Sequence, residues 1–217
     1  MPKKEDPTKS WPAEARNLYT PLRALGTGGF GAVWLASDKQ QQQQEDQSDP
    51  LQTNPNKYVA IKLVGHPSCH PINDFTKISE SGYFHRECEV LSEISHPHIV
   101  KLLNKIELKA DERESIPEAS PYCMVLQYCR GPTVDQMLKH GGALGIYLAR
   151  EVAAQLIDAV SFLHGRGVIH RDIKPDNIRE SQSFFSFLSF CLLHNFTTLD
   201  ILFERMLIML VFLLHYI

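Results

Sequence analysis

The stretch "HRDIKPDN", residues 170–177, is the most informative segment of this 217-residue chain. Its order places a carboxylate, Asp172, two residues before a cation, Lys174, and five before a side-chain amide, Asn177. As composition alone, this is only a polar loop with a proline. In this order, however, it offers a base, a positive charge and a neutral oxygen donor for a metal. Phosphoryl transfer needs these groups, because its catalysis is mainly positioning and charge neutralisation.

The segments upstream of this loop predict strands first and helices second. Short β-favouring runs around a Gly-rich turn predict a hairpin, and apolar residues at helical spacing predict helices. The predicted elements are a hairpin at 17–36, strands at 57–64, 98–108 and 122–129, and helices at 84–94, 133–140 and 144–167. This order favours an α+β fold with two lobes over alternating βαβ units.

Two stretches of low order are predicted in the first part of the chain. Residues 1–17 are polar and interrupted by prolines, so we expect a flexible lead-in. Residues 38–57 contain five consecutive glutamines and several Asp, Asn and Pro, which predicts a disordered low-complexity insertion.

Composition argues against several classes of protein. The net charge is -3, and no cluster of Lys and Arg follows Lys3 and Lys4, which disfavours nucleic-acid binding. Residues 1–30 contain no apolar run of signal-peptide length. The cysteines are odd in number and lack C-x-x-C spacing, so neither a zinc site nor a disulfide framework is favoured. They are Cys69, Cys88, Cys123, Cys129 and Cys191. We expect an intracellular protein, cytoplasmic or nuclear.

Gly26, Gly28 and Gly31 form a G-x-G-x-x-G pattern, with Val33 two residues later. Taken alone, this pattern is explained as well by a glycine-rich hairpin turn. Glycine also lets a backbone close over phosphates and present N–H groups to their oxygens. A dinucleotide site needs a helix directly after the third glycine, whereas "AVWLA" (residues 32–36) continues here as a strand.

Lys62 ends the motif "VAIK" (residues 59–62) on an apolar strand. A strand lysine often extends its charged end to solvent. The position favours a second role, because the side chain would point into the cleft that the Gly-rich turn covers, where a cation could hold nucleotide phosphates. Glu87 on the apolar-faced helix is the candidate to fix this lysine, whereas Glu89 and Glu93 are expected on the solvated face.

In type and order, these motifs resemble the eukaryotic protein kinase family. The resemblance implies that Lys62 binds the α and β phosphates of ATP, with Glu87 as its partner. It implies that Asp172 accepts the substrate hydroxyl proton and that Asn177 binds Mg²⁺. A lysine two residues after the catalytic Asp, as at Lys174, resembles the kinases that act on serine and threonine rather than those that act on tyrosine. The implied ATP-binding residues are Leu25, Gly26, Thr27, Gly28, Gly29, Phe30, Gly31, Val33, Ala60, Lys62, Glu87, Leu126 as gatekeeper, and Gln127 and Cys129 in the hinge.

By this resemblance, the chain contains a complete kinase small lobe with its hinge (residues 18–130) and part of a large lobe (residues 131–178). The small lobe is expected to be a five-stranded antiparallel sheet with one helix. The implied activity is ATP-dependent phosphoryl transfer to Ser or Thr of a protein substrate, with ATP and Mg²⁺ as cofactors. Transfer to a small molecule fits the full motif set less well. The expected partners are ATP and a protein substrate, with neither nucleic acid nor membrane.

The resemblance is expected to end near Arg179. The family has a strand pair after the Asn and then D-F-G, whose Asp holds the metal ion. Neither D-F-G nor A-P-E occurs in residues 178–217, and Asp200 lacks the following Phe-Gly. Arg179 stands where the family has an apolar residue beneath adenine. We therefore expect impaired transfer, with a catalytically inactive ATP-binding or protein-interaction fragment as the alternative.

Residues 179–217 form an apolar tail outside the kinase pattern, and residues 183–217 contain no Gly, Pro or Lys. The most apolar run, residues 206–217, is shorter than the roughly 20 residues of a membrane span. A buried core helix would have little to pack against. The preferred interpretation is translated non-coding sequence. Codons with a central uracil specify Phe, Leu, Ile, Met and Val, so pyrimidine-rich sequence read as protein would have this composition.

Overall fold

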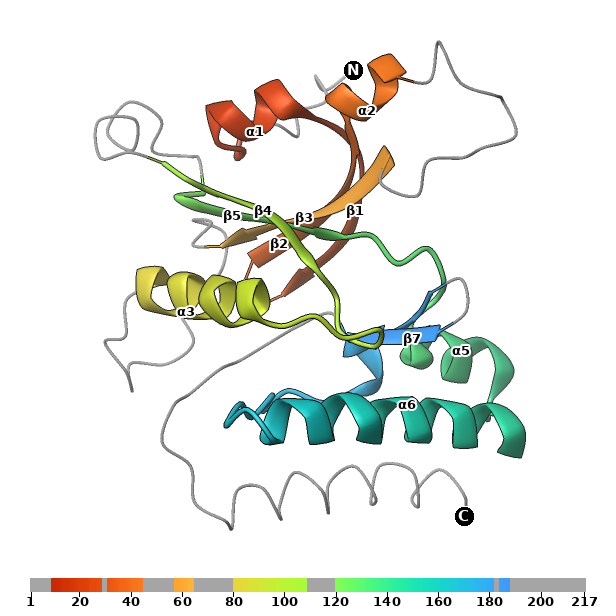
Figure 1. The fold of residues 1–217 in the computed structure, drawn as a ribbon. Helices are drawn as coiled ribbons and strands as arrows, with labels where there is room; N and C mark the ends of the chain where they lie inside the picture. Colours follow the sequence, from red (N-terminus) through yellow and green to blue (C-terminus); the bar gives the residue numbers. More distant parts are fainter. Residues whose placement is uncertain are drawn as a thin grey trace. The chain divides into compact units, whose positions relative to one another are not determined.

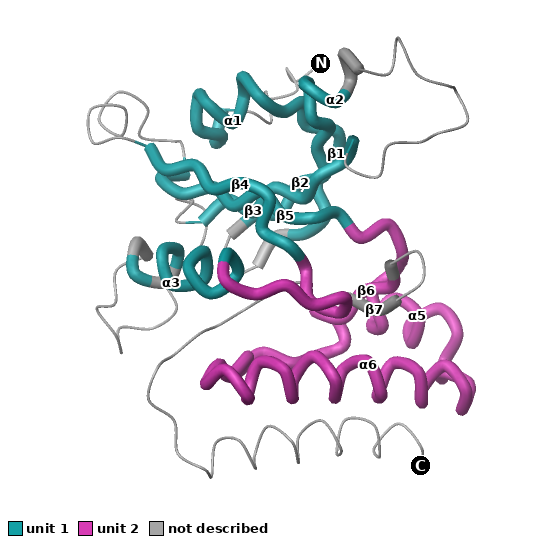
Figure 2. Tube along the Cα trace, in the orientation of Figure 1, with its two compact units in different colours: residues 1–92, 101–128 teal, residues 93–100, 129–217 magenta. Residues whose placement is uncertain are grey.

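A computed structural model describes residues 9–28, 31–44, 57–64, 80–108, 120–181 and 184–187. The chain divides into two compact units, which Figure 2 distinguishes by colour. Residues 1–92 and 101–128 make up the first unit, and residues 93–100 and 129–217 the second. All residues after Tyr128 therefore belong to the second unit.

The first unit is built on a five-stranded antiparallel sheet in the order β1-β2-β3-β5-β4 (Figure 1). The predicted α+β class and the five-stranded sheet are thus confirmed. The predicted strand at 98–108 is shorter than expected, because its pairing with the neighbouring strand begins at Leu102. The strands are β1 (Tyr19–Gly28), β2 (Gly31–Asp38), β3 (Tyr58–Val64), β4 (Leu102–Glu107) and β5 (Tyr122–Gln127).

Helices cover both faces of this sheet. Figure 1 shows α1 (Ala13–Leu18) on one side and α3 (Glu80–Glu93) on the other. The strands β3 and β5 are accordingly buried along almost their whole length, as expected of strands without a solvated face. On α3, Phe84 is buried and stacks on Tyr122 of β5, with ring centroids 4.7 Å apart. The helix predicted at 84–94 is confirmed and begins one turn earlier.

The prediction of a flexible lead-in over residues 1–17 is wrong for residues 9–17. Trp11 and Ala15 are fully buried, and Trp11 meets Trp34 edge to face at 6.3 Å. The N–H of Ser120 donates to the carbonyl of Ser10 at 2.9 Å. One buried Trp contributes enough apolar area to anchor an otherwise polar segment. Its core neighbours on β3 and β5 are Val59, Ile61, Leu63, Cys123 and Val125.

The prediction of a disordered insertion over residues 38–57 is wrong for its first part, which forms α2 (Lys39–Gln44). Asp38 Oδ1 accepts the N–H of Gln40 at 2.9 Å, as a helix-capping side chain does. Lys39 Nζ donates to the carbonyl of Arg16 at 2.7 Å, which fastens α2 to α1. Glutamine is a good helix former, so the glutamine run continues the helix once its start is anchored. Residues 45–56 lie outside the described part of the chain.

In the second unit, the two helices expected at 133–140 and 144–167 are confirmed as α5 (Val134–Gly141) and α6 (Ile146–His164). The start of α5 is a capping box, in which Thr133 Oγ1 accepts the N–H of Gln136 and Gln136 Oε1 accepts the N–H of Thr133. One face of α6 is buried at the spacing of an amphipathic helix. Its buried residues are Ala149, Val152, Leu156, Ala159, Val160 and Leu163.

The second unit continues as an ordered strand pair past the boundary expected near Arg179. A short 3-10 helix, η3 (Pro175–Asn177), leads into β6 (Ile178–Ser181), which pairs with β7 (Phe184–Phe187). The strand pair that the kinase resemblance requires after Asn177 is therefore present. The boundary drawn at residue 178 lies too early in the chain.

The backbone of β6 is also tied to the segment before α5. The N–H of Gly131 donates to the carbonyl of Glu180 at 3.1 Å, and the N–H of Glu180 donates to that of Pro132 at 3.0 Å. A Cβ on Gly131 would lie 2.5 Å from the Glu180 Cβ, so this close approach requires glycine. Arg179 adds a hydrogen bond of 2.7 Å from its guanidinium to the Gly131 carbonyl.

No helix in the described part of the chain is long and apolar enough to span a membrane. Residues 188–217, to which most of the apolar tail and Asp200 belong, lie outside the described residues.

Candidate active site

Gly26, Val33, Lys62 and Met124 form one row across four strands of the first unit. The strand register pairs Gly26 with Val33, Val33 with Lys62, and Lys62 with Met124. Directly opposed residues of neighbouring strands point to the same face of a sheet. The base of the Gly-rich turn, Val33 and the predicted phosphate-binding lysine therefore share one face, whereas Trp11 packs on the residues that alternate with this row.

The residues predicted to line an adenine pocket extend this face. Ala60 and Leu126 lie opposite each other, two residues along from Lys62 and Met124, and each is about 1% exposed. Leu25 is half-buried and lies at an irregularity of β1, where the pairing with β2 shifts register. The sheet thus provides a continuous apolar surface beside Lys62.

The Gly-rich stretch forms the predicted hairpin. Gly28 and Gly31 are the last paired residues at its tip, and Thr27 pairs with Ala32. The other two predicted loop residues, Gly29 and Phe30, lie outside the described residues.

Gly26 has open space where a side chain would begin. A Cβ built on this residue meets no atom within 4 Å. Packing among the described residues therefore gives no reason for a glycine here. Space of this kind beside a strand hairpin suits a ligand that approaches the backbone, as the phosphate-covering interpretation requires.

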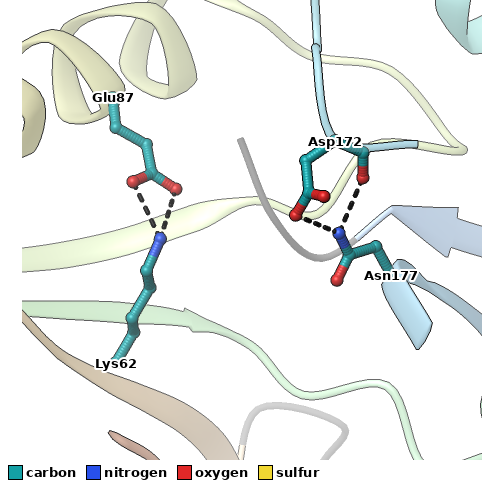
Figure 3. Close-up of polar contacts among 4 residues, drawn as sticks. All are labelled: Lys62, Glu87, Asp172 and Asn177. Atoms are coloured by element: carbon teal, nitrogen blue, oxygen red, sulfur yellow. Dashed lines mark hydrogen bonds and ion pairs between the residues drawn. The ribbon is translucent and has the colours of Figure 1, made fainter. Parts of the chain in front are cut away.

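Lys62 and Glu87 form a buried ion pair between β3 and α3 (Figure 3). The Nζ of Lys62 donates to both carboxylate oxygens of Glu87 at 2.8 Å, and the side chains are 8% and 9% exposed. Desolvating two charges costs several kcal/mol per ion, which only good geometry offsets. Such a pair is weak evidence for stability, so its presence favours a functional need for a fixed cation.

The residue after Glu87 is held in its neutral form. Burial raises the pKa of the Cys88 thiol to about 11, and the negative charge of Glu87 acts in the same direction. Burial also raises the pKa of Cys123 on β5. Neither thiol is therefore an ionised nucleophile near neutral pH.

The predicted hinge residues flank the passage from the first unit to the second. Gln127 ends β5, and its backbone N–H donates to the carbonyl of Lys101 at 2.9 Å. The next residue, Tyr128, accepts a hydrogen bond of 3.4 Å from the Arg23 guanidinium. Cys129 is the first residue of the following unit and is 2% exposed.

In the second unit, contacts among its own residues fix the conformation of the loop at residues 170–177. His170 is 1% exposed, and its Nδ1 accepts the backbone N–H of Asp172 at 3.2 Å. Arg171 between them has a φ of 62°, a left-handed conformation that residues other than glycine rarely adopt. Together these features fix the backbone of Asp172. This role of His170 is missing from the predicted site, because a polar residue in a loop gives no sign of its burial.

Lys174 and Asn177 both contact one carboxylate oxygen of Asp172. Lys174 Nζ lies 3.0 Å from Asp172 Oδ2, and Asn177 Nδ2 donates to the same oxygen at 2.8 Å. The Asn177 amide also donates to the Asp172 carbonyl at 2.7 Å, and both of its bonds appear in Figure 3. Hydrogen bonds to an ionised carboxylate are strong, so they orient Asp172. The carboxylate side chain is 26% exposed and remains accessible.

The predicted metal ligand, Asn177, can bind a cation only through its side-chain oxygen, Oδ1. Its amide nitrogen donates both of its hydrogen bonds to Asp172. Among the described residues, no group of three or more His, Cys, Asp and Glu could hold a metal ion. Mg²⁺ is commonly bound through one or two protein oxygens with waters and substrate phosphates. The Oδ1 atom of Asn177 fits a Mg²⁺ ion that is bound mainly by waters and substrate phosphates. It does not fit a metal site in which the protein supplies all the ligands.

The family model "Protein kinase domain" matches residues 48–183. The matched range includes Lys62 and Glu87, the loop with Asp172, Lys174 and Asn177, and all of β6. The Gly-rich hairpin precedes it in the chain.

Curated relatives are similar over most of this chain. Serine/threonine-protein kinase tousled-like 2 of Mus musculus is 30% identical over 166 residues, which cover 74% of this chain and 19% of that protein. Serine/threonine-protein kinase PRR1 of Saccharomyces cerevisiae is 31% identical over 192 residues, covering 80% and 35%. Serine/threonine-protein kinase TOUSLED of Arabidopsis thaliana is 30% identical over 162 residues, covering 74% and 20%.

The matched part of the chain spans between 18% and 35% of the length of these three relatives and of human tousled-like 2. The family model, in contrast, covers more than half of the chain, and it includes the ion pair and the loop described above. The chain belongs to the protein kinase family, with serine/threonine kinases as its relatives.

Proposed function

We propose that this chain carries the ATP-binding and catalytic residues of a protein serine/threonine kinase. The observation that carries the proposal is the convergence of Lys174 and Asn177 on the Asp172 carboxylate. A carboxylate held in this way, with one face accessible, can accept a proton from a substrate hydroxyl while a neighbouring cation offsets developing negative charge. Family membership supports the choice of phosphoryl transfer as the reaction.

In the first unit, Lys62 is the proposed ligand of the ATP phosphates. Its ammonium group is fixed by Glu87, so it needs no further ordering when an anion binds. The open space at Gly26 gives the phosphates access to the hairpin backbone. The apolar surface beside Lys62 is the proposed adenine-binding wall, formed by Val33, Ala60 and Leu126.

In the second unit, Asn177 is the proposed Mg²⁺ ligand through its Oδ1. A bound Mg²⁺ would supply charge neutralisation at the phosphates. Residues 178–217 contain no D-F-G, so this sequence lacks the Asp that holds the metal ion in the kinase family. We therefore propose that transfer by this chain is weak. The second candidate function, a catalytically inactive ATP-binding or protein-interaction fragment, rests on this same missing group.

The partners proposed for this chain are ATP and a protein with a Ser or Thr acceptor, and neither nucleic acid nor membrane. An intracellular location, cytoplasmic or nuclear, is proposed from the cysteines. Cys88 and Cys123 are buried as thiols in the first unit, which suits a reducing compartment.

The test uses the full 217-residue chain with Mg²⁺ and radiolabelled ATP, and general acceptor proteins such as casein. Asp172→Ala is the catalytic control and Lys62→Met the nucleotide-binding control. ATP binding is measured separately, from the shift of the unfolding temperature with nucleotide. We expect weak ATP binding that Lys62→Met removes, and transfer close to the Asp172→Ala background.

Three results would change this view. Robust Mg²⁺-dependent transfer that Asp172→Ala removes would confirm the reaction and contradict the proposed impairment. Transfer that persists in Asp172→Ala would contradict its role as base. Absence of any nucleotide effect on the folded chain would contradict ATP binding and leave the interaction fragment as the better candidate.

A further inference from the structure

The segment between α3 and β4 is fastened to α6 by two histidines. Residues Glu93–Val100 belong to the second unit, although the elements on either side of them belong to the first. His96 Nε2 lies 3.2 Å from Asp158 Oδ2 on α6, and His98 Nε2 lies 3.8 Å from the same oxygen. The two histidine side chains are about one-tenth exposed, whereas Asp158 is 61% exposed. The attachment thus joins two buried rings to an accessible carboxylate.

Hydrogen bonding fixes the protonation state of His96. Its Nδ1 accepts the backbone N–H of His98 at 3.2 Å, so Nδ1 carries no proton. The single proton of the neutral ring therefore lies on Nε2, from which it is donated to Asp158. Protonation of Nδ1 would bring two N–H groups face to face, and the His98 backbone would lose its acceptor.

The surroundings of His96 also disfavour its charged form. The ring packs against Phe162 with centroids 4.6 Å apart, and the Arg166 guanidinium lies 3.6 Å from the centre of that same Phe162 ring. Burial lowers the pKa of His96, Asp158 opposes this effect, and the neighbouring His98 and Arg166 add to it. Because the folded pKa lies below the ordinary value, the attachment stabilises the fold at neutral pH and is lost as the pH falls below about 6.5.

We propose that His96, the His98 amide and Asp158 form an acid-sensitive latch that holds residues 94–100 against α6. At neutral pH the latch is closed through the neutral His96 ring. On acidification, Nδ1 takes up a proton, the His98 amide is released, and the segment loosens from α6. This segment directly follows α3, the helix that carries Glu87. The latch goes beyond the proposed kinase function and does not depend on it.

The test is a pH titration of the isotope-labelled full chain by NMR, from about pH 8 to about pH 5. It follows the His96 ring and the backbone amide of His98. The expected result is that both signals change with one midpoint, below that of an ordinary histidine. Hydrogen-exchange protection of the His98 amide, corrected for intrinsic exchange, falls several-fold across the same range.

His96→Asn is the diagnostic variant, because an Asn side-chain oxygen can still accept the His98 N–H but does not titrate. We expect its His98 amide to stay protected at acid pH. His85→Asn is the matched control, because His85 pairs with Glu107 at 3.5 Å but is half exposed and lies on α3. It should retain the pH response of the unmodified chain.

Two results would overturn the latch. One is a His98 amide that remains protected in the unmodified chain while the His96 ring titrates. The other is a loss of protection that persists in His96→Asn, which would assign the response to another group. If the variant fails to fold, the titration of the unmodified chain still decides the first point.

Discussion

Lys62 Nζ lies 2.8 Å from each carboxylate oxygen of Glu87 in the interior of the first unit. Removing only one partner leaves an uncompensated buried charge. We therefore expect Lys62→Met to lower the free energy of unfolding by about 3–5 kcal/mol. The double variant Lys62→Met/Glu87→Leu should recover much of this loss, because it buries apolar groups in place of both charges. Urea unfolding of the single and double variants measures the difference.

Lys139→Met is the matched control for this ion pair. Lys139 lies 2.7 Å from Asp135, but its side chain is 70% exposed, so solvent screens the interaction. Its unfolding midpoint should match that of the unmodified chain. If Lys62→Met behaved like Lys139→Met, the Lys62–Glu87 pair could not be desolvated in solution.

Trp11→Ala should show that the N-terminal segment belongs to the folded core. Trp11 is fully buried between α1 and the sheet, and truncating a buried Trp to Ala costs about 3–5 kcal/mol. Thermal unfolding measures the loss, and Trp34 remains as a fluorescent reporter. Leu22→Ala, at a site on β1 that is 49% exposed, is the control and should leave the unfolding temperature nearly unchanged. Equal effects of the two substitutions would contradict the burial of Trp11.

Local periodicity explains why most elements of the fold could be predicted. The alternation of β3 and the helical spacing of α6 are signals contained within one segment, and both elements occur where expected. The Lys62–Glu87 pair was predictable too, because a cation on a buried strand requires a fixed anion nearby. The five-stranded sheet was expected from the resemblance to the kinase family, and the sheet is present. Its covering by α1 as well as α3 was not expected.

Tertiary contacts explain most of what could not be predicted. A single Trp in a polar segment shows no periodicity, so the burial of Trp11 becomes visible only with the sheet that receives it. The glutamine run looks disordered by composition, and its helix depends on Lys39 reaching the Arg16 carbonyl. β6 and β7 lie where the residue types change abruptly, yet the backbone pairing continues across that change. For Trp11 and for α2, a distant partner that is absent from the local pattern accompanies the conformation.

Cys88 and Cys123 should resist alkylation in the folded chain. The pKa of Cys88 is raised to about 11 by burial and by Glu87, and burial raises that of Cys123 as well. At about pH 8, the native thiolate fraction of Cys88 is then roughly a thousandth. Treatment with iodoacetamide followed by mass spectrometry should show label at these positions only after unfolding.

The same pKa shift predicts a loss of stability in alkaline solution. Between about pH 9 and about pH 11, the folded Cys88 keeps a proton that the unfolded chain releases, so the free energy of unfolding falls as pH rises. Cys88→Ala should lose less stability across this range. A slope identical to that of the unmodified chain would assign the alkaline effect to other groups.

Gly131 and Gly26 should respond in opposite ways to the same substitution. At Gly131 an added Cβ would lie 2.5 Å from the Glu180 Cβ and 2.6 Å from its carbonyl oxygen. The backbone of residues 131–133 must then move away from β6, so Gly131→Ala should lower the free energy of unfolding by about 1–3 kcal/mol. At Gly26 an added Cβ meets no atom within 4 Å, so Gly26→Ala should keep the unfolding midpoint of the unmodified chain.

Gly26→Ala should affect ATP binding rather than stability. If the space at Gly26 receives nucleotide phosphates, the methyl group of Gly26→Ala should weaken ATP binding without destabilising the chain. The measurement is the nucleotide-induced shift of the unfolding temperature for each variant, compared with its own ligand-free value. A full shift in Gly26→Ala would mean that the phosphates do not approach this backbone, and the space at Gly26 would then be ordinary solvent beside a hairpin.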